Sequence, residues 1–131
     1  MRKDIVIPEI KNVTVVVKPP EQRGHWSVHL VNTNNFPIEN VLVATKGYSK
    51  TSADREETSV LRHFFDQLGP GQSLQVELID PQVFHLFNEY AVTYYVDKEI
   101  YYKKFIFVPG SITPDNLIFN PVLQANVITH A

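Results

Sequence analysis

Two histidines, His25 and His29, stand four positions apart, which is the spacing of a zinc-binding pair on one face of a helix. The residues around them alternate instead, since Trp26, Val28 and Leu30 fall on the opposite side, and a period of two is typical of a β-strand. Four residues along a strand span about 13 Å, which is too far for two ligands of one metal ion. We therefore expect both histidines on the solvent face of a strand, and no metal or other cofactor.

His63 is the strongest candidate for acid-base chemistry, because a carboxylate such as Asp66 can orient an imidazole and Arg62 lies beside it. The nearest possible nucleophile in the sequence is Ser59. The chain has no Gly-x-Ser-x-Gly nucleophile turn, phosphate-binding glycine loop or dinucleotide fingerprint. We expect these side chains to be structural, and a small hydrolase is only a remote alternative.

A group of acidic residues, Asp54, Glu56 and Glu57, lies in the longest polar segment, 46–59. Grouped carboxylates can serve glycoside hydrolysis or bind cations. Here they are interleaved with Arg55, so a solvated loop of mixed charge is the better interpretation. We therefore do not expect an enzyme.

The segment from residue 90 to residue 107 is rich in aromatic residues. One face of a hairpin must fill the core, and tyrosines on the other face can stack on sugars or anchor a protein interface. Two neighbouring lysines in a chain of net charge -2 are weak support for nucleic acid, so no nucleic-acid partner is expected. The predicted interaction surface combines this hairpin with the 46–59 loop and the C-terminal tail, and its residues are Tyr95, Tyr101, Lys103, Tyr48, Leu117 and Phe119.

The elements that position these residues are predicted to be short strands. Alternating or β-branched runs indicate strands at 13–18, 25–32, 39–46 and 73–79, the last with Leu74, Val76 and Leu78 facing inward. Segment 60–68 fits either a helix or a buried strand, and its aromatic content and flanks favour the strand. Asp80 is a typical N-cap residue and Pro81 a typical first helical residue, so this pair predicts one or two helical turns that include His85.

The segment 90–108 is predicted to be a hairpin around the short turn 97–99. Its register is open, because a slip of one residue exchanges Tyr94 and Tyr102 between core and solvent. The connector NTNNFP, from Asn32 to Pro37, is predicted to turn the chain between two strands, since asparagine tolerates unusual turn geometries.

Two stretches carry a resemblance to a known fold family. WSVHLVNTNNFPIENVLVATKGY resembles the second and third strands of bacterial immunoglobulin-like domains, and LGPGQSLQVELID is similar to the turn before the fifth strand of immunoglobulin-like and fibronectin type III domains. The resemblance spans about Val13 to Val108. It implies an immunoglobulin-like fold and no reaction. Together with the predicted strands, turn signals and helix start, it leads us to expect an all-β, antiparallel immunoglobulin-like sandwich of about seven strands with a short crossover helix.

Length and composition agree with one soluble domain. A chain of 131 residues with 44% hydrophobic and 20% charged residues can build a single core, here expected at about 5–108, with an apolar tail at 109–131. The absence of cysteine excludes disulfides and thiolate sites within the chain. No apolar stretch reaches the roughly 20 residues of a membrane span, and no signal peptide is recognisable, so a cytoplasmic protein without a membrane partner is expected.

The tail contains Leu117, Ile118 and Phe119 and must either pack on its own domain or dock on another chain. We therefore expect a non-catalytic protein-interaction or assembly module that binds a protein partner or a second copy of itself. The alternative is a carbohydrate-binding module that uses exposed tyrosines.

Overall fold

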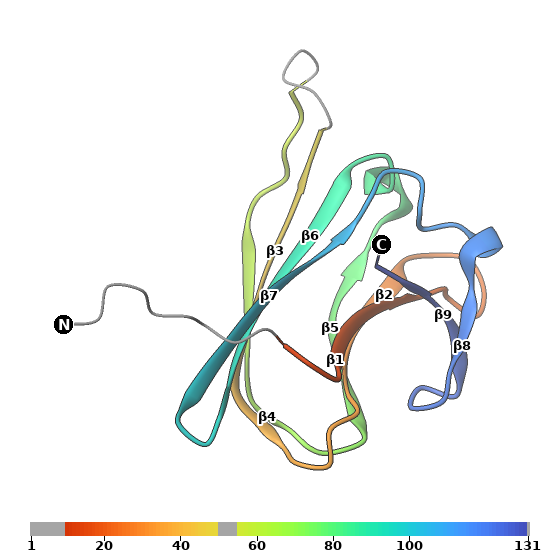
Figure 1. Cartoon of the computed structure of the whole chain (residues 1–131). Helices are drawn as coiled ribbons and strands as arrows, with labels where there is room; N and C mark the ends of the chain where they lie inside the picture. Colours follow the sequence, from red (N-terminus) through yellow and green to blue (C-terminus); the bar gives the residue numbers. More distant parts are fainter. Residues whose placement is uncertain (1–9, 50–54, 131) are drawn as a thin grey trace.

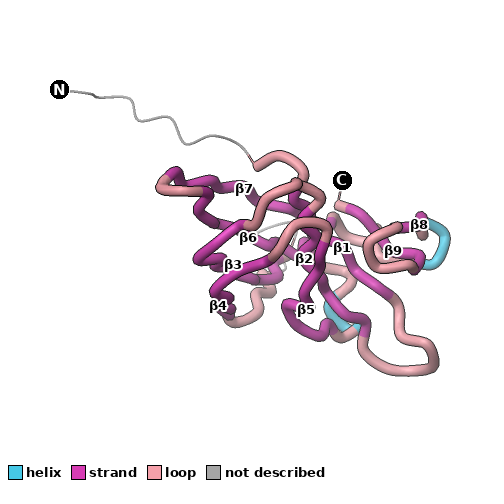
Figure 2. Tube along the Cα trace, turned by 90° about the horizontal axis from the view of Figure 1, so that it is seen from below, coloured by secondary structure: helices cyan, strands magenta, loops and turns pink. Residues whose placement is uncertain are grey.

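The computed structural model describes residues 10–49 and 55–130, and these form nine strands in two antiparallel sheets (Figure 1). The first sheet has the order β5-β2-β1-β9-β8 and the second has the order β4-β3-β6-β7. Figure 2 shows the two sheets as facing layers. The predicted all-β antiparallel sandwich is confirmed, and it agrees with an immunoglobulin-like architecture at a coarse level. The strands are β1 (Val13–Lys18), β2 (Trp26–Asn32), β3 (Ile38–Tyr48), β4 (Leu61–Leu68), β5 (Gln72–Ile79), β6 (Phe87–Val96), β7 (Glu99–Phe107), β8 (Ile118–Asn120) and β9 (Ala125–Thr129).

The core between the sheets follows from the alternation of apolar residues along the strands. Alternate residues of a strand point to opposite faces, so the inner positions of both sheets meet. These positions are almost inaccessible to solvent and include Val15, Val17, Val28, Leu30, Val41, Val43, Tyr90, Val92 and Phe105.

Segment 60–68 is a strand, as its flanks and aromatic residues predict. β4 pairs with β3 from Ile38↔Leu68 to Thr45↔Leu61, and it forms one edge of the second sheet. The expected burial of this strand is wrong, because Phe64 lies on the outer face of the sheet and is 62% exposed, and Leu61 is 52% exposed.

The closing hairpin is also confirmed, and its register is now fixed. β6 and β7 pair from Asn88↔Phe107 to Val96↔Glu99, with Tyr94 opposite Tyr101. This register buries Tyr94, which is 2% exposed, and turns Tyr102 outward at 39% exposure.

The expected crossover helix is wrong. Asp80 does cap a helical start, because its Oδ1 accepts a hydrogen bond from the Gln82 amide at 2.9 Å, but the element is a single 3-10 turn, Pro81–Val83. The segment has to carry the chain from β5 in one sheet to β6 in the other within seven residues, which leaves no room for a longer helix. His85 is consequently no helix-packing residue, since its side chain is 59% exposed and lies 3.0 Å from the Glu56 carboxylate.

The predicted inward position of Leu78 is wrong as well. The pairing of β2 with β5 shifts between Val28↔Glu77 and His29↔Gln75, so Val76 is an extra residue in a β-bulge. After the bulge, side chains that would have pointed into the core point outward, and those that would have pointed outward point into the core. Leu78 is therefore 59% exposed, and Glu77 points between the sheets in its place.

The tail packs on its own domain and adds the two strands beyond the expected seven. A second 3-10 turn, Pro114–Asn116, precedes β8, and β9 pairs with β1. Ile112 and Ile128 enter the main core, and Val122 and Leu123 cover the outer face of the first sheet at Val16, Val31 and Val127. Figure 1 shows β8 and β9 on the side of the molecule away from β4. Within the described ranges, no helix has the length and apolar character needed to cross a membrane.

Candidate functional site

A concave site lies at one end of the sandwich, and we call it the end pocket. Its volume is about 610 Å³. Three segments far apart in the sequence meet there: the residues before β1, the β2–β3 connector, and the β6–β7 hairpin. The residues that line it are Lys11, Asn12, Asn34, Phe36, Tyr94, Val96, Glu99 and Tyr101.

Asn32 supports the floor of the end pocket from beneath. It is completely buried, and its Nδ2 donates hydrogen bonds to the carbonyls of Phe36, Leu68 and Gly69 at 3.0, 3.2 and 3.1 Å. Its Oδ1 accepts from both the backbone amide and the side-chain amide of Asn34, at 3.0 and 2.9 Å. One side chain therefore ties the β2–β3 connector to the β4–β5 turn.

The hydrogen bonds continue from Asn34 to the residues before β1. Asn34 Nδ2 donates to the Lys11 carbonyl at 3.2 Å, and Asn34 Oδ1 accepts from Asn12 Nδ2 at 3.3 Å. Asn12 has φ of 59°, a left-handed conformation that asparagine tolerates better than most residues. The sequence predicts NTNNFP as a turn, but nothing in it indicates that these amides also hold Asn12 and Lys11 in place.

Aromatic rings form the wall of the end pocket. The rings of Tyr94 and Tyr101 are stacked, with centroids 5.4 Å apart and an interplanar angle of 20°. Burial, with a smaller contribution from Tyr101, raises the pKa of Tyr94 to about 12. Tyr101 donates its hydroxyl hydrogen to Glu99 Oε1 at 3.0 Å, and this bond is the main cause of its raised pKa. Phe36, on the connector, is 41% exposed.

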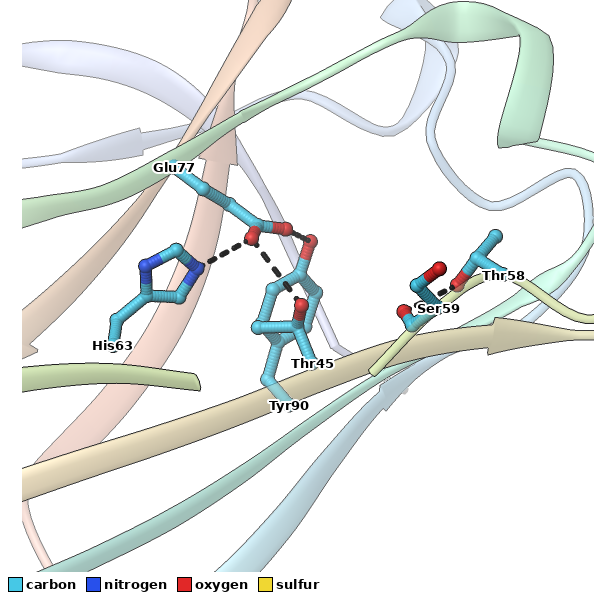
Figure 3. Close-up of polar contacts among 6 residues, drawn as sticks. All are labelled: Thr45, Thr58, Ser59, His63, Glu77 and Tyr90. Atoms are coloured by element: carbon cyan, nitrogen blue, oxygen red, sulfur yellow. Dashed lines mark hydrogen bonds and ion pairs between the residues drawn. The ribbon is translucent and has the colours of Figure 1, made fainter. Parts of the chain in front are cut away.

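A second polar group, the Glu77 cluster, lies between the sheets and consists of Glu77, His63, Thr45 and Tyr90 (Figure 3). The Glu77 carboxylate accepts hydrogen bonds from the Tyr90 hydroxyl at 3.0 Å and the Thr45 hydroxyl at 3.2 Å, and its Oε1 lies 2.8 Å from His63 Nε2. Burial and then the charge of Glu77 raise the pKa of Tyr90 well above its ordinary value. The Glu77 carboxylate, on β5, is thus hydrogen-bonded to side chains on three strands of the opposite sheet.

The residues of the suspected hydrolase group are not brought together. His63 contacts Glu77 instead of Asp66, and Figure 3 shows Ser59 beside Thr58 and apart from His63. Thr58 Oγ1 donates a hydrogen bond to the Ser59 carbonyl and accepts one from the Gly47 amide. Thr58 therefore connects the end of the polar segment 46–59 to the end of β3. Sequence reasoning did not find Glu77, because the bulge that turns it inward leaves no recognisable pattern.

The other candidate ligands are dispersed. His25 lies 3.4 Å from Asp80, whereas His29 is 9% exposed and bonded to Ser27 at 2.8 Å. The expected solvent-facing position of His29 is therefore wrong, and burial lowers its pKa, with a smaller effect from Lys18. No group of three or more histidine and acidic side chains within residues 10–49 and 55–130 could share a metal ion.

The polar segment 46–59 is only partly described. Ser49 donates its amide to the Glu56 carbonyl, and Glu57 forms an isolated bridge with Tyr48, so the described part extends the pairing of β3. Asp54 lies outside the described residues.

The six residues of the predicted interaction surface lie on different parts of the molecule. Tyr48 and Tyr95 both face outward on the second sheet. Tyr48 lies at one end of β3, whereas Tyr95 pairs with Glu39 near the other end, so the two residues are about 26 Å apart along the strands. Tyr101 lines the end pocket, and Lys103 lies over the Phe105 ring at 5.3 Å. Leu117 packs on the core, while Phe119 is 60% exposed on β8.

No protein-family model, curated protein or solved structure matches this chain. The functional inferences below therefore depend only on its residues and their contacts.

Proposed function

We propose that this chain is a non-catalytic assembly module of immunoglobulin-like or fibronectin type III-like type, and that it pairs with a second copy of itself along β4. The observation that carries the proposal is the order of exposed residues on this edge strand: Arg62, Phe64 and Asp66. Phe64 is 62% exposed and Leu61 is 52% exposed.

β4 carries the charges of Arg62 and Asp66 but lacks the other features by which edge strands usually avoid pairing. An edge strand presents unpaired backbone groups, and proteins protect it with lysine, proline, bulges or short length. The other edges of this sandwich have such features, since β7 carries Lys103 and Lys104, β5 contains the bulge at Val76, and β8 has three residues. β4 has eight residues and contains neither lysine nor proline.

The charges on β4 are complementary to those of a second, antiparallel β4. If a two-fold axis passes beside Phe64, that residue lies opposite its own copy, and Arg62 lies opposite Asp66 of the second chain. Neither Arg62 nor Asp66 forms an ion pair with any described residue of its own chain. Pairing would therefore satisfy two ion pairs, cover two phenylalanine rings, and join the two four-stranded sheets into one.

Charge reversal tests the proposal directly. Asp66→Arg or Arg62→Asp replaces both attractive pairs with like-charge pairs, and we expect each to weaken the dimer by about tenfold or more. The double reversal, Arg62→Asp with Asp66→Arg, restores the complementarity and should restore the dimer. Lys104→Glu on the opposite edge is the matched control and should have no effect.

Sedimentation equilibrium provides the measurement, since the dimer has twice the 15.0 kDa mass of the chain. A protein that stays monomeric up to about 1 mM contradicts the proposal. A dimer that both single reversals leave intact also contradicts it, because the interface then lies elsewhere, for example at the exposed Ile118 and Phe119 of β8.

A further inference from the structure

We propose that the end pocket binds a neutral carbohydrate. Its volume of about 610 Å³ lies within the roughly 300–1,000 Å³ of small-ligand sites. None of the residues that line the site belongs to β4, so this inference is independent of self-association.

The polar atoms of the pocket suit the hydroxyl groups of a sugar. A sugar hydroxyl both donates and accepts hydrogen bonds, so its site needs groups of both kinds. Glu99 Oε2 and Asn12 Oδ1 accept no hydrogen bond from another described residue, and they are the available acceptors. The Lys11 ammonium is the available donor, since no described residue pairs with it.

The aromatic wall suits the apolar face of a sugar ring. Tyr101 is only partly buried, and it is supported from behind by the stacked ring of Tyr94, which is 2% exposed. Phe36 presents a second exposed ring from the connector. Rings held in place before binding lose little conformational entropy when a ligand packs against them.

The floor of the pocket is also fixed in advance. Asn34 donates hydrogen bonds to Asn32 Oδ1 and to the Lys11 carbonyl, and it accepts one from Asn12 Nδ2, so the Asn12 side chain and the Lys11 backbone are held in one arrangement. A site whose side chains are fixed by their supporting contacts binds more tightly than one that must be ordered by the ligand.

The charge of the pocket favours a neutral ligand. Among the described residues that line it, Lys11 and Glu99 are the only ionic side chains, apart from the weakly acidic tyrosine hydroxyls, and their charges cancel. A phosphate or a nucleotide would meet the Glu99 carboxylate, and the described lining offers no second cation to offset it.

The outward tyrosines make a poorer carbohydrate site. Tyr95 lies opposite Ile100, and Tyr102 lies opposite Thr93, so the two rings are diagonal neighbours on the outer sheet face. They are not a stacked pair, and neither of them lines the end pocket. Rings, amides and a carboxylate converge on the surface of the end pocket instead.

Calorimetric titration with neutral trisaccharides tests the site; maltotriose, cellotriose, xylotriose and chitotriose are suitable probes. We expect saturable binding of at least one probe. Tyr101→Leu, which keeps an apolar side chain but removes the ring, should weaken this binding about tenfold or more. Phe36→Leu and Glu99→Gln should weaken it as well, and these side chains are exposed enough to be replaced without loss of the fold.

Tyr102→Leu is the matched control, because it removes a tyrosine from the adjacent position of the same strand but on the outer face. Binding should be retained in this variant. The inference is overturned if no probe binds at up to about 10 mM, which is beyond the Kd of a weak ligand. It is also overturned if Tyr102→Leu abolishes binding while Tyr101→Leu does not, since the outer face is then the site.

Discussion

Replacing Glu77 tests whether the Glu77 cluster holds the two sheets together. Glu77→Ala removes the acceptor of the Tyr90 hydroxyl, of the Thr45 hydroxyl and of His63. Tyr90 is 2% exposed, so its hydroxyl has little contact with water that could replace the lost acceptor. The His63 side chain is 26% exposed and can recover hydration in part.

The size of the effect follows from these exposures. A hydrogen bond to a charged group contributes about 1.5–3 kcal/mol, and a buried donor left without a partner costs about 1–3 kcal/mol. Counting Tyr90 in full and the two other bonds in part, we expect Glu77→Ala to lower the free energy of unfolding by about 3–5 kcal/mol, the range found when one partner of a buried pair is removed. Glu39→Ala, on the exposed surface of β3, should change it by less than about 0.5 kcal/mol.

Urea unfolding followed by the fluorescence of Trp26, the single tryptophan, measures both variants. A double-mutant cycle with Tyr90→Phe then isolates one bond. Because Tyr90→Phe removes the donor that Glu77→Ala leaves unpaired, the two changes should couple by about 1.5–3 kcal/mol. A loss below about 1 kcal/mol in Glu77→Ala, or additive effects in the cycle, would refute the view that this carboxylate links the sheets.

Three further predictions concern the other buried polar groups. Asn32→Ala should lower the free energy of unfolding by about 3–4 kcal/mol in the same urea assay, because three carbonyls and the Asn34 amides lose their partner, whereas Asn35→Ala, at an exposed connector position, should cost far less. His29 has a lowered pKa in the folded chain, so the stability it provides is present above its ordinary pKa of 6.5 and is lost as pH falls below that value. The stability difference between the parent chain and His29→Gln should therefore shrink between pH 7.5 and pH 5, and a constant difference would contradict the burial of His29. Tyr94, with its pKa raised to about 12, contributes stability that is present below pH 10 and is lost between pH 10 and about pH 12, so Tyr94→Phe should reduce the alkaline loss by about 1.4 kcal/mol per pH unit. Equal alkaline slopes for the two chains would be inconsistent with that pKa.

The local sequence pattern predicts a strand well where inward and outward side chains alternate along the whole strand. The β-branched run of β1 and the two aromatic runs of β6 and β7 form strands close to their expected bounds. The apolar run of segment 60–68 fits both a helix and a strand, its flanks and aromatic residues favour the strand, and its pairing with β3 confirms that choice. The capping signal of Asp80 and Pro81 was real, but the short distance between the two sheets limits it to one turn.

The composition and pattern of this sequence therefore determined an all-β sandwich, because alternation and turn residues act over a few neighbouring positions. They also determined that the connector from Asn32 to Pro37 turns the chain. The position of Asn32 beneath a pocket, and the meeting of Tyr101 and Phe36 in one wall, follow from contacts between distant segments and not from the local pattern. These contacts join residues far apart in the chain, and the bulge at Val76 that turns Glu77 inward depends on pairing with β2. A local pattern contains no information about such partners, since the register between strands is set by the packing of the whole core.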